Sequence, residues 1–71
     1  KNEMKILSIL IKNKGKVVSR DKIMMSLWND DEFVSDNTLT VNVTRLRTRL
    51  KDELGLSNFI KTKKGIGYMV Q

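Results

Sequence analysis

The sequence contains neither cysteine nor histidine. Without cysteine, the chain forms no disulfide and offers no thiolate to a metal ion. Without histidine, it lacks both the commonest general base and the commonest metal ligand of proteins. No pairing of a nucleophile with a base stands out among the remaining residues. These absences argue against an enzyme, and the sequence predicts no bound metal and no cofactor.

A long apolar run is also lacking. The most apolar stretch, residues 4–11, is far too short to cross a bilayer and has no small-residue cleavage site like that of a signal peptide. We therefore expect a cytoplasmic protein without a membrane partner. Because 71 residues with 39% hydrophobic content and clear periodicity suit one folded unit, we expect a single domain, residues 1–71.

Acidic residues are scarce in one part of the chain. Residues 44–64 hold seven of the 14 lysines and arginines but only two acids, whereas residues 1–43 hold seven basic and six acidic side chains. The positive charge therefore belongs to one region, and a polyanion is the partner that such a region attracts. A basic surface without any special partner is the alternative.

Three helices are predicted from apolar spacing. The first covers residues 2–13, the second follows Ser19 as its N-cap, and the third covers residues 37–54 after a cap at Ser35 or Asp36. Gly55 is expected to end the third helix. At 100° per residue, one narrow sector of this helix gathers its core side chains: Leu39, Val43, Leu46, Leu50 and Leu54.

The C-terminal residues predict a β-hairpin. Residues 59–62 form its first strand, residues 63–67 its turn, and Ile66, Tyr68 and Val70 alternate as a half-buried second strand. Residues 17–18 are able to add a third strand. The order of elements predicts an α+β winged helix-turn-helix, in which three helices are followed by a C-terminal hairpin, the wing, at residues 62–68.

The outer face of the third helix carries the side chains that suit a DNA groove. Arg45 can bind guanine O6 and N7, and Val41 can pack on a thymine methyl group. Smaller polar groups and further arginines are placed for the phosphate backbone, and two lysines mark the wing. The backbone candidates are Asn37, Thr38, Asn42, Thr44, Arg47 and Arg49, and the wing candidates are Lys63 and Lys64.

Each candidate also has an ordinary structural interpretation. Arg45 can be a solvated helix residue, and the wing lysines can serve only to discourage edge pairing. Trp28 is expected in the core, although its indole N–H is able to find a phosphate. The acids of residues 30–32 either solvate a loop or form a docking surface. A winged helix that binds another protein is the alternative function, and it would place apolar anchors on the outer face.

Two segments resemble the OmpR/PhoB type of winged-helix effector domain of bacterial response regulators. The recognition helix of that family reads Thr-Val-Asp-Val-His-Ile-Arg-Arg-Leu-Arg-x-x-Leu, and residues 38–50 read TLTVNVTRLRTRL. The family's wing reads Thr-x-Arg-Gly-x-Gly-Tyr, and residues 62–68 read TKKGIGY. The similarity extends over essentially the whole chain. It implies sequence-specific binding of double-stranded DNA in transcription, with the helix in the major groove and the wing near the minor groove.

The resemblance also implies individual roles. Val41 and Arg45 would read bases, and Lys64 would lie near the minor groove. Residues 29–35 resemble a loop that contacts RNA polymerase in the family. The residues implied to touch the DNA backbone are Trp28, Asn37, Thr38, Asn42, Thr44, Arg47 and Thr62.

This chain departs from the family pattern at positions that would touch DNA. The family usually has Asp where this chain has Thr40, His where it has Asn42, and often Arg where it has Thr44. In the wing, Lys64 replaces the usual arginine. A hydrated ammonium loses more on entering a narrow groove than a guanidinium does, so Lys64 should insert more weakly. Because of these departures together, the DNA sequence read by this domain should differ from that of better-known members. Residues 33–43 resemble regulators of the bacitracin-resistance type more closely.

Two parts of the family pattern are missing from the given residues: the phosphorylatable receiver and the four-stranded sheet that covers the first helix. We therefore expect a fragment, with Ile6 and Ile9 exposed as a patch that risks association. The resemblance implies that the full-length protein binds direct repeats as a pair. The isolated domain is expected to be a monomer.

Overall fold

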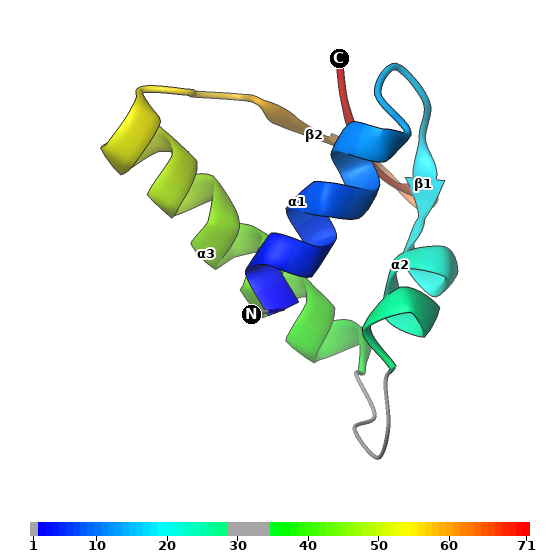
Figure 1. The fold of residues 1–71 in the computed structure, drawn as a ribbon. Coiled ribbons are helices and arrows are strands. Elements are labelled where there is room, and N and C mark those ends of the chain that lie inside the picture. Colours follow the sequence, from blue (N-terminus) through cyan, green and yellow to red (C-terminus); the bar gives the residue numbers. More distant parts are fainter. Residues whose placement is uncertain (1, 29–34) are drawn as a thin grey trace.

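The computed structural model describes residues 2–28 and 35–71. Its elements are α1 (Asn2–Lys12), β1 (Val18–Ser19), α2 (Arg20–Leu27), α3 (Asp36–Leu54), β2 (Ile60–Lys63) and β3 (Gly67–Val70). Figure 1 shows α1 crossing in front of the sheet, between α2 and α3. The predicted winged helix-turn-helix of three helices and a C-terminal hairpin is confirmed.

Short-range signals in the sequence set the ends of the helices. The Ser19 and Ser35 side chains accept hydrogen bonds from the backbone N–H groups of Lys22 (3.1 Å) and Thr38 (3.2 Å), so each caps the helix that follows. Gly55 ends α3 with a φ of 67°, in the left-handed region that glycine enters without strain. All three caps agree with the sequence prediction, and Ser35 rather than Asp36 is the N-cap of α3.

The three strands form one antiparallel sheet in the order β1-β3-β2. Val18 lies opposite Tyr68, and Ile60 lies opposite Val70. The predicted third strand is therefore present, one residue later than expected. Gly65 makes the hairpin turn with a φ of 77°. Gly67 was predicted to lie in the turn, but it is the first residue of β3. Its lack of a side chain allows β1 to lie close to β3, because a Cβ at this position would lie 1.9 Å from the Val18 carbonyl oxygen.

One core lies between the helices and the sheet. Helix α1 contacts α2, α3 and β3, and the i, i+4 pair Ile6 and Leu10 is completely buried among them. The other buried members are Val18, Ile23, Leu27, Leu39, Val43, Leu46, Leu50, Ile60, Tyr68 and Val70. None of the helices in residues 2–28 and 35–71 has the length and hydropathy of a membrane-spanning segment.

Several burial predictions were wrong. Leu54, placed in the core row of α3, is 65% exposed because it is the last helical residue and extends past the core. Ile66 is 58% exposed because it lies in the turn and not in β3. All four residues of β3 are buried, since β3 is the central strand and not a half-buried edge.

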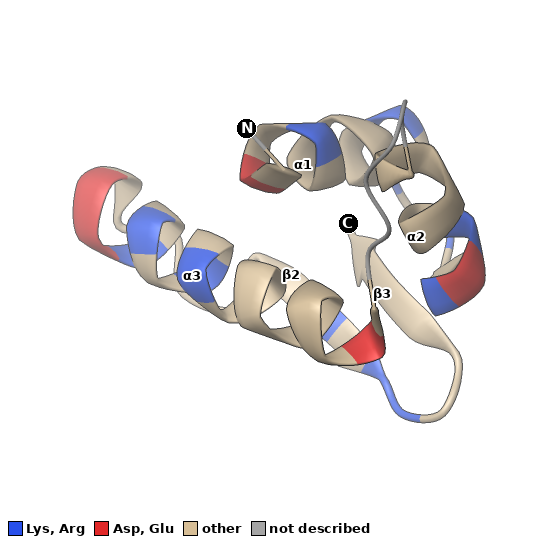
Figure 2. Ribbon diagram, turned by 90° about the horizontal axis from the view of Figure 1, so that it is seen from below, with Lys and Arg blue, Asp and Glu red and all other residues tan. Residues whose placement is uncertain are grey.

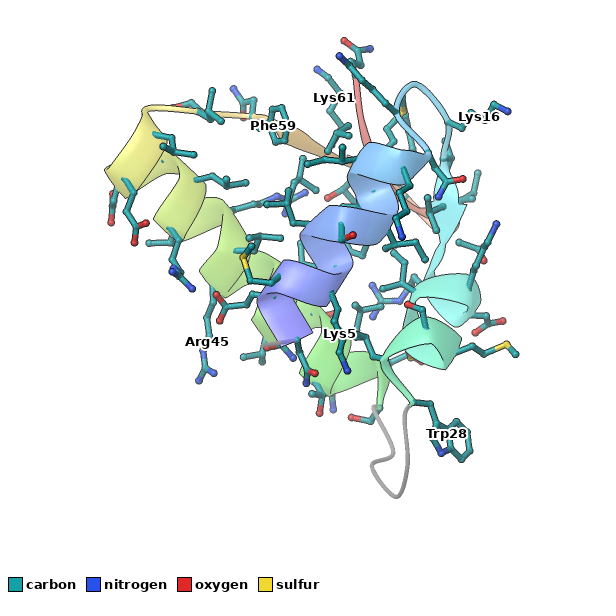
Figure 3. All side chains as sticks on the ribbon, viewed as in Figure 1. Lys5, Lys16, Trp28, Arg45, Phe59 and Lys61 are labelled. Carbon is teal, nitrogen blue, oxygen red and sulfur yellow. The ribbon has the colours of Figure 1, made fainter. Side chains whose placement is uncertain are left out.

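The first helix and the tryptophan also differ from expectation. Ile6 is buried and Ile9 packs partly against the core, whereas Met4 and Ile11 are about half exposed. The packing of α1 against both α2 and α3 turns its Ile6 side inward. Trp28, expected in the core, is 55% exposed, and Figure 3 shows its side chain pointing away from the body of the molecule.

Candidate nucleic-acid interface

Helix α3 has a buried face and an outer face. Leu39, Val43, Leu46 and Leu50 enter the core. Val41 is 47% exposed on the other side, and Arg45 is exposed one turn later. Figure 3 shows the Arg45 side chain extending away from the protein. Within the described residues, Arg45 makes neither an ion pair nor a hydrogen bond, so its guanidinium is available to a ligand.

The small polar side chains beside Val41 are folded back onto the helix. The amide of Asn42 donates to the Thr38 carbonyl oxygen at 2.9 Å, and the Thr44 hydroxyl donates to the Thr40 carbonyl oxygen at 3.0 Å. A threonine hydroxyl has a single hydrogen, so Thr44 must rotate before it donates to a phosphate. Asn42 retains a second amide hydrogen, which can donate to another acceptor without such a change. Asn37 and Thr38 are exposed in the first turn of α3.

The hairpin turn extends the basic surface beyond α3. Lys63 and Lys64 are exposed, and the turn lies next to the N-terminal end of α3 (Figure 2). A shallow hollow separates the two, lined by Ser19, Arg20, Asp21, Asp36, Gly65 and Ile66. The outer face of α3 and the lysine-bearing turn are thus adjacent, as a wing beside a recognition helix requires.

Arg47 and Thr62, both predicted to touch a DNA backbone, are in contact with each other. The Arg47 guanidinium donates to the Ile60 carbonyl oxygen at 3.3 and 3.1 Å and to the Thr62 hydroxyl. It also lies 5.8 Å from the centroid of the Tyr68 ring. In the free chain, Arg47 therefore fastens α3 to β2, and its role at DNA stays a prediction.

Arg49 is bound by two carboxylates. Its side chain pairs with Glu3 of α1 at 3.1 Å and with Glu53, one turn further along α3, at 3.5 Å. The hydrogen bond to Glu3 and the charge of Glu53 raise the pKa of Arg49 above its ordinary value. A phosphate would have to compete with both acids for this guanidinium, so Arg45 is more readily available than Arg49.

Arg20 belongs to this surface, although sequence reasoning gave it no role. Its guanidinium donates to Asp36 Oδ1 (3.0 Å), to the Asp36 carbonyl oxygen (2.9 Å) and to the Thr40 hydroxyl (3.0 Å). It also donates to the Tyr68 hydroxyl at 2.7 Å. Partial burial opposes the charge, but the bonds to Asp36 and Tyr68 outweigh the burial and raise the pKa of Arg20. One sequence signal for such a contact was not used: Tyr68, predicted to be half-buried, has a hydroxyl that needs a partner.

Comparison with known proteins places this arrangement in a family. Residues 1–70 match the family described as "Transcriptional regulatory protein, C terminal". The sensory transduction protein BceR of Halalkalibacterium halodurans is 61% identical over 71 residues, which are all of this chain and 30% of that protein. The chain thus spans about a third of the length of the curated relatives it matches.

Solved structures share the fold over nearly the whole chain. The C-terminal domain of the nisin resistance regulator NsrR, a lantibiotic response regulator, is 43% identical with a TM-score of 0.83, and the match covers 97% of this chain and 68% of that one. The DNA-binding domain of the response regulator AdeR, solved in complex with an intercistronic region, is 30% identical with a TM-score of 0.82, covering 99% and 68%. The chain therefore belongs to the family of C-terminal domains of transcriptional regulatory proteins, the OmpR/PhoB type that its sequence resembles.

Proposed function

We propose that this chain is the effector domain of a response-regulator transcription factor and binds double-stranded DNA sequence-specifically. Helix α3 enters the major groove, and the hairpin of residues 62–68 lies at the neighbouring minor groove. The observation that carries the proposal is the exposure of Val41 and Arg45 on α3, directly opposite the buried leucine row. The solved complex of a DNA-binding domain with the same fold supports it.

The chemistry of the outer face suits direct readout of bases. The free guanidinium of Arg45 can make two parallel hydrogen bonds to guanine, and the branched methyl groups of Val41 can contact a thymine methyl. Asn37 and Thr38 lie in the first turn of α3, where phosphates also meet the positive end of the helix dipole, and Asn42 follows one turn after Thr38. These residues set the orientation of the helix, and Val41 with Arg45 sets the sequence that is bound.

Charge favours DNA over the alternative of a protein-interaction module. Residues 44–64 carry seven basic and two acidic side chains, and the outer face of α3 offers one large apolar side chain, Val41. Protein interfaces usually need several apolar or aromatic anchors at their centre. A single valine among threonines and arginines suits a groove lined by phosphates better than a protein partner.

The proposal is tested by selecting bound duplexes from a random pool and then measuring affinity as salt rises. We expect a defined motif, and a logarithm of the association constant that falls linearly with the logarithm of the salt concentration. Sequence selection without enrichment would contradict the proposal. Affinity for a protein partner that does not change with salt would favour the interaction module.

Further parts of the proposal concern the longer regulator. Two copies bind direct repeats, the isolated domain remains a monomer, and the protein works in the cytoplasm, where the chromosome is. The likeness to the nisin resistance regulator supports a role in the response to antimicrobial peptides. Contact with RNA polymerase through residues 29–35 stays a prediction, because residues 29–34 lie outside those the structure describes.

A further inference from the structure

Arg20 connects the three pieces from which the interface is built. It is the first residue of α2, and its backbone N–H donates to the Ile66 carbonyl oxygen in the hairpin turn at 3.1 Å. Its guanidinium reaches Tyr68 in β3 at 2.7 Å. The same guanidinium reaches Asp36 and Thr40 in the first turns of α3 at 2.9–3.0 Å.

These contacts end next to the groups that would meet DNA. Thr40 precedes Val41 in the sequence, and Tyr68 pairs across the hairpin with Thr62, two residues before Lys64. A guanidinium is planar, and its donors have fixed directions. Four bonds from one such group therefore fix both the distance and the angle between the start of α3 and the hairpin.

The bond to the buried Tyr68 hydroxyl contributes to folding, but stability does not account for the pairing of Arg20 with Asp36. The side chains of Arg20 and Asp36 are 29% and 70% exposed, and exposed ion pairs contribute little to folding. What the contacts do preserve is geometry. If α3 and the hairpin turn are held rigidly relative to each other, the turn can bind the same duplex as α3 without a further loss of conformational entropy.

We infer that Arg20 is a positioning residue for DNA recognition: it holds the lysine-bearing turn at a fixed offset from α3, so that Lys64 and Arg45 engage one duplex together. The inference rests on the proposed function. Arg20 does not itself touch the DNA in this arrangement, and its contribution passes through Asp36, Thr40 and Tyr68.

A double-mutant cycle tests the inference. Lys64→Ala is measured in the unmodified chain and in Arg20→Met, a change that keeps the length of the side chain and removes its donors. In the unmodified chain, Lys64→Ala should lower the salt slope by about one unit. In Arg20→Met, where Arg47 still joins α3 to β2, we expect Lys64→Ala to lower the slope and the affinity clearly less than in the unmodified chain. A full Lys64→Ala effect in folded Arg20→Met would overturn the inference.

Two further variants separate geometry from charge and from folding. Lys22→Met removes an equal charge from an exposed position of α2, and the Lys64→Ala effect should persist there. Tyr68→Phe removes only the hydroxyl that accepts from Arg20 at 2.7 Å, and it should weaken the coupling partially. If Arg20→Met does not fold, Tyr68→Phe and Thr40→Val decide the question, and a full Lys64→Ala effect in both would overturn the inference.

Hydrogen exchange of the free chain provides a readout that does not need DNA. The Ile66 amide, bonded to the Lys63 carbonyl oxygen at 2.9 Å, should exchange faster in Arg20→Met and at an unchanged rate in Lys22→Met. If the unmodified chain binds no duplex, the proposed function fails. The role in DNA recognition then fails with it, whereas the structural part of the inference, that Arg20 holds the turn against α3, is judged by this exchange: an unchanged rate in Arg20→Met would overturn that part.

Discussion

Arg45, Arg47 and Arg49 stand two residues apart on α3, yet each meets a different environment. Arg47 binds a carbonyl and a hydroxyl of β2, Arg49 pairs with Glu3 and Glu53, and Arg45 faces solvent. Recruiting Arg47 or Arg49 to a phosphate requires existing bonds to break, whereas recruiting Arg45 requires only the loss of water. Charge counted along the sequence treats the three alike, but the fold distinguishes them.

Replacement of Arg45 should reduce both affinity and selectivity. We expect Arg45→Ala to cost about 1–3 kcal/mol at the selected site and to flatten base preference at the position it reads, because a bidentate pair with guanine is lost. Competition binding with single-base variants of the site measures both effects. Lys22→Ala is the matched control, because it removes one charge from α2. A variant with undiminished preference at every base pair would remove Arg45 from base reading.

Replacement of Gly67 should destabilise the fold. An added Cβ would lie 1.9 Å from the Val18 carbonyl oxygen and 2.8 Å from Ser19 Cα, so backbone would have to move and β1 would separate from β3. We expect Gly67→Ala to lower the free energy of unfolding by about 1–3 kcal/mol, the range of overpacked sites. Urea denaturation measures this loss.

Gly65→Ala is the comparison, since its added Cβ has no neighbour within 4 Å and its φ is 77°. There the cost should come only from backbone strain, about 1–2 kcal/mol. A Gly67→Ala chain as stable as the unmodified one would show that β1 is not held closely against β3.

At the level of elements, the N-cap of α3 contributes to the stability of the fold. The Ser35 side chain accepts from the Thr38 N–H and lies 3.0 Å from the Thr38 hydroxyl. Ser35→Ala should lower the free energy of unfolding by about 0.5–2 kcal/mol, as for other lost N-caps. Ser57→Ala, in the exposed segment after α3, should have almost no effect. Equal stabilities of the two variants would show that this cap is dispensable.

Elements were predictable where a short stretch of sequence determines the outcome. Ser19, Ser35 and Gly55 cap their helices through bonds to residues within one or two turns, and the row from Leu39 to Leu50 follows helical periodicity. The errors at Leu54, Ile66 and Trp28 arose where burial depends on how far a distant partner extends. Periodicity cannot supply that distance.

For the molecule as a whole, the net charge of +6 predicts strong dependence of binding on salt. We expect Lys64→Ala to weaken binding to all duplexes about equally and to lower the salt slope by about one unit. Titration of binding at several salt concentrations checks this. An unchanged slope would place the hairpin turn outside the interface.

Sequence reasoning located the candidate surface but not its internal connections. The exposed positions of Val41, Arg45, Lys63 and Lys64 follow from periodicity and from the hairpin. The contacts of Arg20 join residues 16 to 48 positions apart, and nothing local in the sequence relates them. Such pairings depend on the packing of α2, α3 and β3 together.

The place of β3 at the centre of the sheet has a consequence for synthesis on the ribosome. Both β1 and β2 pair with β3, which is the last element of the chain described here, and the Val70 carbonyl oxygen also accepts from the Gly15 amide at 2.8 Å. Until these final residues leave the exit tunnel, the earlier strands have no neighbour to join. The nascent helices must therefore wait, with part of their apolar surface uncovered, for the C-terminal end of this segment to complete the fold.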